Sequence, residues 1–222
     1  MYINRDHAFT DLDAMHALMD AHPLGAWVLQ GDTGMVANHI PFLLDRSQGP
    51  QGTLIGHVAR ANPAWRALAA QTPSLVIFQG PDSYITPNWY PGKAEHGKVV
   101  PTWDYAVVHA HGVARAVEDP AWLLYMLERL TNRHEAAQPA PWKVKDAPRA
   151  YIDKLLRAIV GIEIRIERLE GKLKASQDEA GEDRLGTVAG LRRSGNSNAD
   201  AMANLVEGEL QSGAVCVNGR AP

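Results

Sequence analysis

Residues 98–118, KVVPTWDYAVVHAHGVARAVE, decide the fold class of this chain. The stretch is rich in valine and aromatic residues and predicts one long β segment. Side chains alternate between the two faces of a strand, so every second residue here shares a face. One face therefore carries Trp103, Tyr105, Val107, His109 and His111. A face that ends in two histidines is unusual for a purely apolar core.

Strands and a few helices are predicted on both sides of this segment. Two apolar runs around a Gly/Asp turn at residues 31–34 predict a β-hairpin. Residues 81–92 contain Pro81, Pro87 and Pro91, and they predict a turn-rich break after a buried strand. The other predicted strands occupy residues 25–30, 35–45, 53–59, 74–80 and 159–171, and the predicted helices begin near residues 11, 63, 120 and 150. Mostly antiparallel strands with short connections indicate an α+β fold, a closed or split β-barrel with peripheral helices.

The composition changes after Gly171, where the chain becomes rich in polar and small residues. Two short helices are predicted there, over residues 183–191 and 199–210. We therefore expect a split-barrel domain over residues 1–175, a helical C-terminal extension over 176–212 and a mobile tail over 213–222.

Composition and charge exclude several classes of protein. The 222 residues are 45% hydrophobic and 21% charged, as in an ordinary globular chain. The net charge of -3 disfavours a large non-specific nucleic-acid surface. A single cysteine, Cys216, excludes an internal disulfide. No signal peptide and no apolar run of about 18 residues is found, so we expect a cytoplasmic protein without a membrane anchor.

One candidate anion site lies where a predicted strand leads into a short helix. Arg60 and Asn62 end the strand and start the helix, and His39 lies on a neighbouring strand. A planar guanidinium beside free helix N–H groups suits a phosphate. The alternative is that Arg60 makes a structural ion pair and Asn62 only caps the helix.

A second group of candidate residues is aromatic. Trp89 and Lys93 lie in the turn-rich segment beside Tyr84 and Tyr90, where the rings can stack on a planar ligand or fill a core. The pair His109 and His111 can ligate one metal ion, but no third ligand stands at a recognised spacing, so we expect buried or interface histidines and no metal site.

The segment after the last predicted strand, GKLKASQ, places two lysines beside short polar donors. Lys172, Lys174, Ser176 and Gln177 can reach an anionic ligand from there, or they form a solvated loop. The sequence contains no GxGxxG, P-loop, HExxH, CxxC or GxSxG motif.

Several motifs, in order along the chain, closely resemble the PaiB family of FMN-binding negative transcriptional regulators. The motifs are NHIPFLLD, GHVARANPAW, VIFQGPDSYITPNWYPGK, VVPTWDYAVVHAHG and AIVGIEIRIERLEGKLKASQ. The resemblance covers nearly all of residues 1–180. It implies a split β-barrel like that of pyridoxamine-phosphate oxidase, and a homodimer that holds FMN at the subunit interface.

The resemblance also implies roles for individual residues. Arg60 and Asn62, with His39, are expected near the flavin phosphate. Lys172, Ser176 and Gln177 are expected to reach in from the partner chain. The residues expected along the ring or the dimer seam are Trp89, Lys93, Thr102, Trp103 and Tyr105.

Two positions depart from the family pattern, each by exchanging an amide for a carboxylate. Asp104 stands where the family usually has Asn in Trp-Asn-Tyr, and Asp178 stands where it has Asn in Ser-Gln-Asn. A carboxylate in contact with a dianionic phosphate would repel it.

Three other functions fit the same fold. A flavin-dependent oxidoreductase would pass electrons from FMN to a small substrate. A haem-binding protein would use His109 or His111 as an axial ligand. A repressor that contacts DNA directly is disfavoured by the net charge of -3, although a dimer can gather its basic residues on one face.

Overall fold

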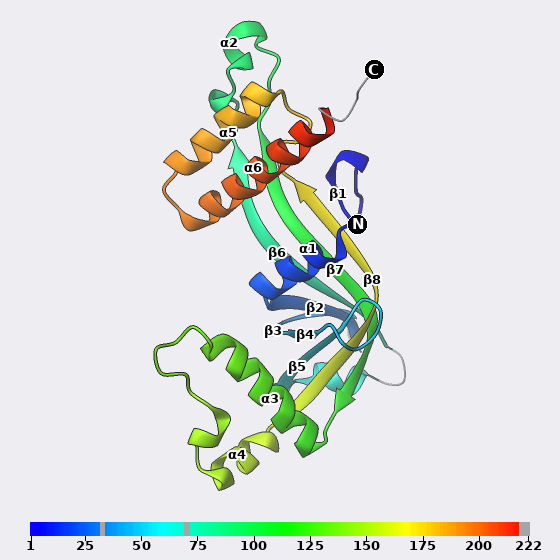
Figure 1. The fold of residues 1–222 in the computed structure, drawn as a ribbon. Helices are drawn as coiled ribbons and strands as arrows, with labels where there is room; N and C mark the ends of the chain where they lie inside the picture. The colour runs from blue at the N-terminus through cyan, green and yellow to red at the C-terminus, as the bar shows by residue number, and fades with distance from the viewer. Residues whose placement is uncertain (32–33, 69–71, 218–222) are drawn as a thin grey trace. The chain divides into compact units, whose positions relative to one another are not determined.

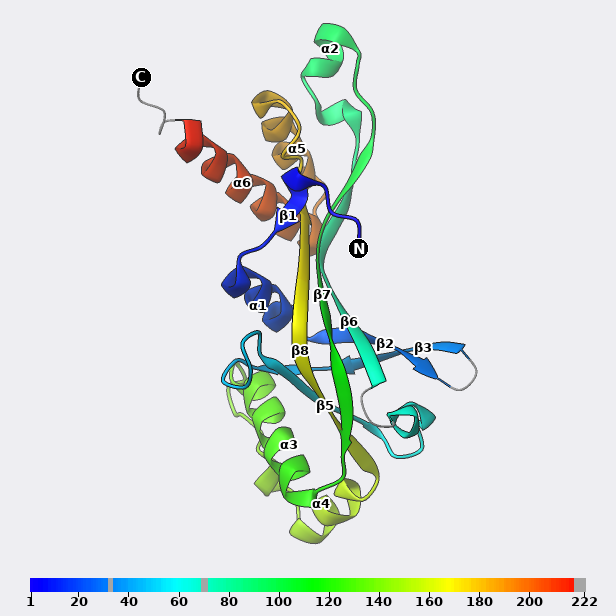
Figure 2. The same cartoon turned by 90° about the vertical axis from the view of Figure 1, so that its right-hand side faces the viewer.

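A computed structural model describes residues 1–31, 34–68 and 72–217, with side chains described up to residue 210. Its ribbon is drawn from two directions in Figures 1 and 2. The strands are β1 (Ala8–Phe9), β2 (Leu24–Gly31), β3 (Gly34–Pro41), β4 (Leu43–Asp45), β5 (Thr53–Ala59), β6 (Thr72–Ile85), β7 (Thr102–Val117) and β8 (Ile159–Lys174). The α-helices are α1 (Leu12–Ala21), α2 (Gly92–His96), α3 (Pro120–Glu135), α4 (Arg149–Leu156), α5 (Gly181–Arg193) and α6 (Ser197–Val217). Short 3-10 turns are η1 (Arg5–His7), η2 (Pro63–Ala67), η3 (Pro87–Trp89) and η4 (Val144–Asp146).

The strands form one eight-stranded antiparallel sheet, which confirms the predicted α+β class. Its order is β3-β2-β6-β7-β8-β5-β4, and β1 pairs with β8. The β2–β3 hairpin is present as predicted, with Trp27 opposite Asn38. The strand β8 pairs with β5, where Gly56 lies opposite Ile162. The predicted strand over 159–171 therefore exists and continues to Lys174.

The structure corrects the predicted break after residue 80. The strand β6 runs through Pro81 and ends at Ile85. The described pairing of β2 with β6 covers residues 74–77 of β6, so Pro81 lies beyond the part of β6 that pairs with β2. Proline is tolerated in a strand where one side lacks a hydrogen-bonded neighbour.

The chain divides into two compact units, which we call the first unit and the second unit. The first unit comprises Met1–Asp11, Gln79–Val107 and the chain from Glu170 onward, and the second comprises Leu12–Phe78 and Val108–Leu169. The expected domain boundary at residue 175 and the mobility of the tail stay predictions. Residues 213–217 of that tail belong to α6, and residues 218–222 lie outside the described part of the chain.

In the second unit, α3 and α4 pack against strands β4 and β5 (Figure 1). The predicted helix after residue 119 is confirmed, because Asp119 caps α3 by accepting hydrogen bonds from the N–H groups of Ala121 and Trp122 at 3.3 and 3.1 Å. The buried residues that join these elements are Leu43, Ile55, Leu123, Met126, Leu130, Val144, Ile152 and Leu156.

In the first unit, α5 and α6 lie side by side (Figures 1 and 2). They bury an apolar cluster with Ile85 of β6 and with Tyr90. Two glycines let α5 approach closely: a Cβ at Gly190 would lie 2.1 Å from the Trp89 ring, and one at Gly186 would lie 2.0 Å from the Trp89 carbonyl oxygen. No helix among the described residues combines the length and apolar character needed to cross a bilayer.

Candidate functional site

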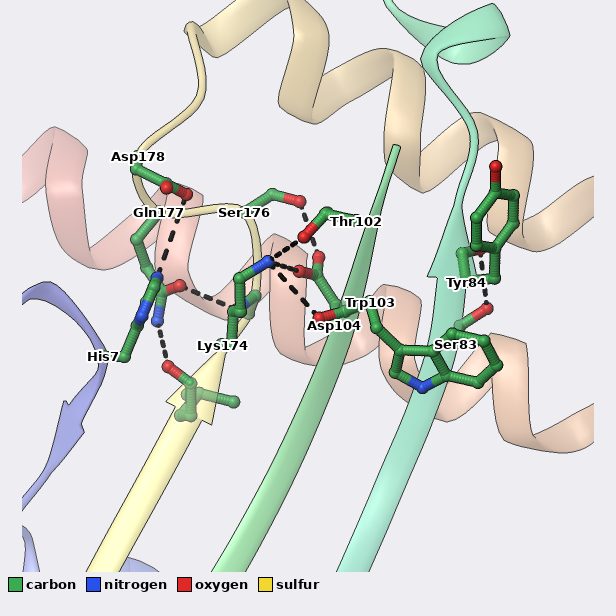
Figure 3. Close-up of polar contacts among 12 residues, drawn as sticks. His7, Ser83, Tyr84, Thr102, Trp103, Asp104, Lys174, Ser176, Gln177 and Asp178 are labelled. Atoms are coloured by element: carbon green, nitrogen blue, oxygen red, sulfur yellow. Dashed lines mark hydrogen bonds and ion pairs between the residues drawn. The ribbon is translucent and has the colours of Figure 1, made fainter. Parts of the chain in front are cut away.

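A buried carboxylate connects β7 to the chain that leaves β8 (Figure 3). Asp104 of β7 has no exposed surface. Its Oδ2 accepts a hydrogen bond from the Ser176 hydroxyl at 2.6 Å, and its Oδ1 lies 3.4 Å from Lys174 Nζ. The same ammonium group donates to the hydroxyl of Thr102 and to the carbonyl oxygen of Trp103. We call Thr102, Asp104, Lys174 and Ser176 the Asp104 cluster.

The turn between β8 and α5 is fixed by its own side chains. Gln177 Oε1 accepts a hydrogen bond from the Ala175 N–H at 2.7 Å, and Gln177 Nε2 donates to the Leu173 carbonyl oxygen at 2.8 Å. Ser176 has a φ of 55°, in the left-handed region that non-glycine residues rarely adopt. The polar groups of Gln177 therefore form hydrogen bonds within the turn, and the Ser176 hydroxyl forms one with Asp104.

Burial favours the protonated forms of Asp104 and of two ionisable neighbours, Glu179 and Tyr90. Burial raises the pKa of Asp104, although hydrogen bonds from Ser176 and the charge of Lys174 oppose that rise. Burial also raises the pKa of Glu179, and the nearby carboxylates of Asp178 and Asp183 raise it further. The phenol of Tyr90 has a raised pKa for the same reasons, burial first and then Glu179.

The opposite face of β7 carries exposed aromatic side chains. Alternation along the strand places Trp103 and Tyr105 on the face away from Asp104. Trp103 is 53% exposed, and its ring lies edge-on to Tyr84 at 6.1 Å (Figure 3). The Lys172 ammonium lies 5.3 Å from the centre of the Tyr105 ring. We call Tyr84, Trp103, Tyr105 and Lys172 the aromatic face.

Trp89 and Lys93 serve local structure in the first unit. Trp89 packs against the apolar cluster of α5 and α6, next to Gly190. Lys93 is exposed and donates to Asn88 Oδ1 at 2.5 Å. The structure thus places Trp103, Tyr105 and Lys172 on one face, and Thr102, Ser176 and Lys174 around Asp104.

In the second unit, Arg60 has the contacts of the structural alternative. Its Nη1 donates to Glu118 Oε2 at 2.5 Å, its Nε to the Arg157 carbonyl oxygen at 2.8 Å, and its Nη2 to the Ile159 carbonyl oxygen at 3.2 Å. The guanidinium also lies 5.8 Å from the centre of the Trp65 ring. A phosphate at Arg60 would have to replace these partners.

The side chains of Asn62 and His39 point to different places and do not form a shared site. Asn62 caps η2 by accepting the Ala64 N–H at 2.9 Å, and its amide donates to Asn38 Oδ1 at 2.7 Å. His39 follows Asn38 on β3, so its side chain lies on the other face of that strand, where it is exposed. His109 and His111 lie on β7 with ring centres 6.3 Å apart.

The buried carboxylate Asp45 was not singled out from the sequence. Asp45, at the end of β4, accepts hydrogen bonds from Ser47 and from Arg129, which is 84 residues away. Asp104 was noted as a departure, but its role as a hub was not predicted. The available signal was its alternation with the buried residues Ala106 and Val108, which places a carboxylate on a buried face.

Comparisons with known proteins place the chain in a family and a fold class. A family model described as "Putative FMN-binding domain" matches residues 1–168. The chain belongs to this FMN-binding family. A relative from Bacillus subtilis, protease synthase and sporulation protein PAI 2, is 30% identical over 95% of this chain and 99% of its own length. An uncharacterized protein of Aspergillus fumigatus is 34% identical over 93% of this chain and 97% of its own.

Solved structures share the fold of this family member. An FAD and haem binding protein from Mycobacterium smegmatis superposes with a TM-score of 0.58 at 22% identity, covering 81% of this chain and 79% of that one. The flavocytochrome Anf3 from Azotobacter vinelandii gives a TM-score of 0.56 at 15% identity, covering 78% of this chain and 72% of that one. The predicted split β-barrel is thereby confirmed.

The residues of the aromatic face fit an anionic planar group such as a flavin. Lys172 supplies a cation whose hydrogen bond to the Tyr2 carbonyl oxygen is long, 3.4 Å, and Tyr105 and Trp103 supply ring surfaces. Lys174, in contrast, already faces the Asp104 carboxylate. Asp104 therefore meets a cation of its own chain, and the expected repulsion of a phosphate applies to the buried side of β7.

Proposed function

We propose that this protein binds FMN. The observation that carries the proposal is the family match over residues 1–168. The aromatic face gives local support, because cations and aromatic rings together suit a planar ring system with an anionic tail. FMN, when bound, supplies one- and two-electron redox chemistry.

In this proposal Lys172, Tyr105 and Trp103 hold the cofactor. Lys172 binds an anionic or carbonyl oxygen, and the two rings offer stacking surface. Thr102, Ser176 and Gln177 act indirectly, because their polar groups hold the ends of β7 and β8 in place. Trp89 and Lys93 support the neighbouring loop.

The phosphate site that the family resemblance implies lies in the second unit and is proposed separately. Arg60 of the second unit, with Asn62 and His39 as neighbours, is a candidate phosphate clamp considered by itself, and a phosphate there replaces Glu118 and the carbonyl oxygens of Arg157 and Ile159. The pair of Arg60 and Glu118 is partly exposed, with side chains 36% and 56% accessible, so loss of this one ion pair has a modest free-energy cost.

We further propose that two copies of the chain form a homodimer that shares the cofactor. The half-exposed rings of Tyr84 and Trp103 support this, because clustered exposed aromatic residues commonly mark an interaction surface. Light scattering of the purified protein tests the assembly. A monomer at all concentrations, with and without FMN, contradicts it.

The biological role we propose is regulation of transcription in the cytoplasm, with the flavin-dependent oxidoreductase as the competing role. The resemblance to the PaiB family motivates the regulator. Reduction of the bound flavin by NADH with turnover would favour the enzyme. A promoter-DNA shift that weakens with added salt would favour direct DNA contact, which the net charge of -3 makes a localised contact at most.

The cofactor is tested by a visible spectrum of the purified protein and by titration with FMN. We expect flavin absorbance, and we expect Lys172→Gln to weaken FMN binding by about 10-fold to 100-fold, since a lost charge-assisted hydrogen bond costs about 1.5–3 kcal/mol. Lys154→Gln, an exposed lysine of α4, is the matched control and leaves the affinity unchanged. A protein that takes up no FMN overturns the proposal.

Haem is the second candidate cofactor, and the pair of histidines on β7 is the observation that favours it. His109 and His111 are half-buried with ring centres 6.3 Å apart, and imidazole is a common axial ligand of haem iron. The same spectrum separates the two cofactors, because bound haem gives a Soret band that FMN lacks.

A further inference from the structure

A small cavity lies in the second unit, lined by residues of α3, η4 and α4. Its volume is about 180 Å³. Pockets for cofactors and drug-sized ligands measure about 300–1,000 Å³, so this cavity fits a smaller molecule. Its lining residues differ from those of the aromatic face and from Arg60 and the partners of Arg60. The cavity is therefore a separate candidate site.

Each of the three elements lines the cavity with one apolar and one charged side chain. Residues three or four positions apart share a face of an α-helix, so each helix can present both of its residues to the cavity. The pairs are Leu124 and Glu128 on α3, Val144 and Lys145 on η4, and Ile152 and Arg149 on α4. The cavity therefore combines an apolar surface with charges of both signs.

The apolar surface of the cavity is continuous with the core of the second unit. Val144 and Ile152 are 7% and 8% exposed and belong to the apolar cluster that joins α3 and α4 to β4 and β5. Leu124 and Ala147 pack against the same cluster. An aliphatic group bound there leaves water for a surface that the fold already holds in place.

The positive charges of the cavity suit a carboxylate. Lys145 is exposed, and Arg149 uses its Nε to donate to Asp153 Oδ1 at 2.8 Å, which occupies one of the five N–H donors of a guanidinium. The start of α4 has no side-chain cap, and Ala147 and Arg149 on either side of it line the cavity. The positive end of the helix dipole therefore adds to the two cations.

Glu128 gives the cavity a negative charge as well. An apolar carboxylate without an amino group would be attracted by Lys145 and Arg149 but repelled by Glu128, and an apolar amine would meet the reverse arrangement. A small molecule that carries both a carboxylate and an ammonium group finds a favourable partner for each. The mixed charges thus select a zwitterion with an aliphatic side chain.

We propose that this cavity binds a free α-amino acid with a branched aliphatic side chain, such as leucine. Lys145, Arg149 and the start of α4 hold its carboxylate, and Glu128 holds its ammonium group. The side chain lies against the apolar surface formed by Leu124, Val144 and Ile152. This site goes beyond cofactor binding and does not depend on it.

The test is a titration of the full chain, labelled with carbon-13 at its methyl groups, followed by NMR. We expect leucine to shift the methyl signals of Leu124, Val144 and Ile152 saturably, with a dissociation constant on the order of 1 mM for so small a ligand. Three analogues each lack one part of leucine: 4-methylpentanoate the ammonium group, 3-methylbutylamine the carboxylate and glycine the side chain. The two aliphatic analogues should bind about twofold to fivefold more weakly than leucine, and glycine at least about 10-fold more weakly.

Two variants assign the charges. Glu128→Gln should weaken leucine by about twofold to fivefold and leave 4-methylpentanoate equally tight or tighter, whereas Lys145→Gln should weaken both and spare 3-methylbutylamine. The matched controls are Glu182→Gln and Lys154→Gln, which change exposed residues outside the cavity lining and keep the wild-type affinities.

Three results would overturn the proposal. The first is the absence of a saturable shift with leucine up to about 10 mM. The second is binding of 4-methylpentanoate as tight as that of leucine, which would make the cavity a carboxylate site. The third is a Glu128→Gln protein in which leucine and 4-methylpentanoate change in affinity by the same factor, because Glu128 would then not contact the ammonium group.

Discussion

At the scale of single residues, the buried carboxylates of Asp45 and Asp104 have pKa values shifted in opposite directions. Asp45 is 5% exposed, and its Oδ1 accepts hydrogen bonds from the Ser47 N–H at 3.1 Å and from the Ser47 hydroxyl at 2.7 Å. Its Oδ2 receives Arg129 Nη1 at 2.5 Å. Burial by itself would raise the pKa of Asp45, but hydrogen bonds from Ser47 and Arg129 outweigh burial and lower it. The charged form of Asp45 therefore stabilises the fold, in contrast to that of Asp104.

Replacing Asp45 by Asn tests this difference. We expect the free energy of unfolding in urea to fall by about 1–3 kcal/mol at neutral pH, because an amide cannot accept all the hydrogen bonds of a carboxylate. The difference from the wild type should shrink as the pH falls below 3.8. Asp153→Asn, which removes a mostly exposed pair with Arg149, is the control and changes stability by less than about 0.5 kcal/mol.

At the scale of elements, close contact of α5 with η3 depends on missing side chains. A Cβ at Gly190 would lie 2.1 Å from the Trp89 ring, and the ring belongs to the packed cluster of the first unit. A Cβ at Gly208 of α6 meets nothing within 4 Å. The two glycines thus occupy helical positions with opposite tolerance for a methyl group.

This contrast gives a paired prediction for thermal unfolding. Gly190→Ala should lower stability by about 1–3 kcal/mol, because the Trp89 ring or the helix has to shift. Gly208→Ala should raise it by about 0.5–1 kcal/mol, because alanine restricts the unfolded chain and favours the helix. A Gly190→Ala protein as stable as the wild type would show that α5 does not pack against Trp89.

At the scale of the whole molecule, the perturbed acids and histidine divide by compact unit. In the first unit the pKa values of Asp104 and Glu179 are raised by burial. In the second unit the pKa of Asp45 is lowered, and burial lowers the pKa of His57. A histidine with a lowered folded pKa stabilises the fold above its unfolded pKa, and that contribution is lost as the pH falls. These groups taken alone favour the folded first unit and disfavour the folded second unit as the pH falls.

Limited proteolysis at about pH 4 and about pH 8 checks this opposition, with a protease active at both. Cleavage within residues 176–193 should be relatively faster at the higher pH, and cleavage near His57 relatively faster at the lower pH. If both regions become more susceptible in the same direction, the two units do not have opposite pH responses.

Local sequence patterns predicted many of the helices and strands, but they did not predict which side chains distant in sequence contact one another. Asp119 followed by Pro120 marks the start of α3, and alternation marks β8, because both depend on neighbouring residues. Arg60 meets Glu118 across 58 residues, and Asp104 meets Ser176 across 72. No periodicity encodes such partners. The candidate site residues stay predictions, and the division between the Asp104 cluster and the aromatic face was not predicted.

The order in which the two units occur along the polypeptide has a consequence for synthesis. The second unit is complete once residue 169 has been added, whereas the first unit combines the opening residues, a middle stretch and everything from Glu170 onward. During synthesis, all residues of the second unit are therefore present before the α5–α6 hairpin of the first unit has been added. Chaperones that act on the nascent chain would meet the apolar side of residues 79–107 before α5 and α6 exist to cover it.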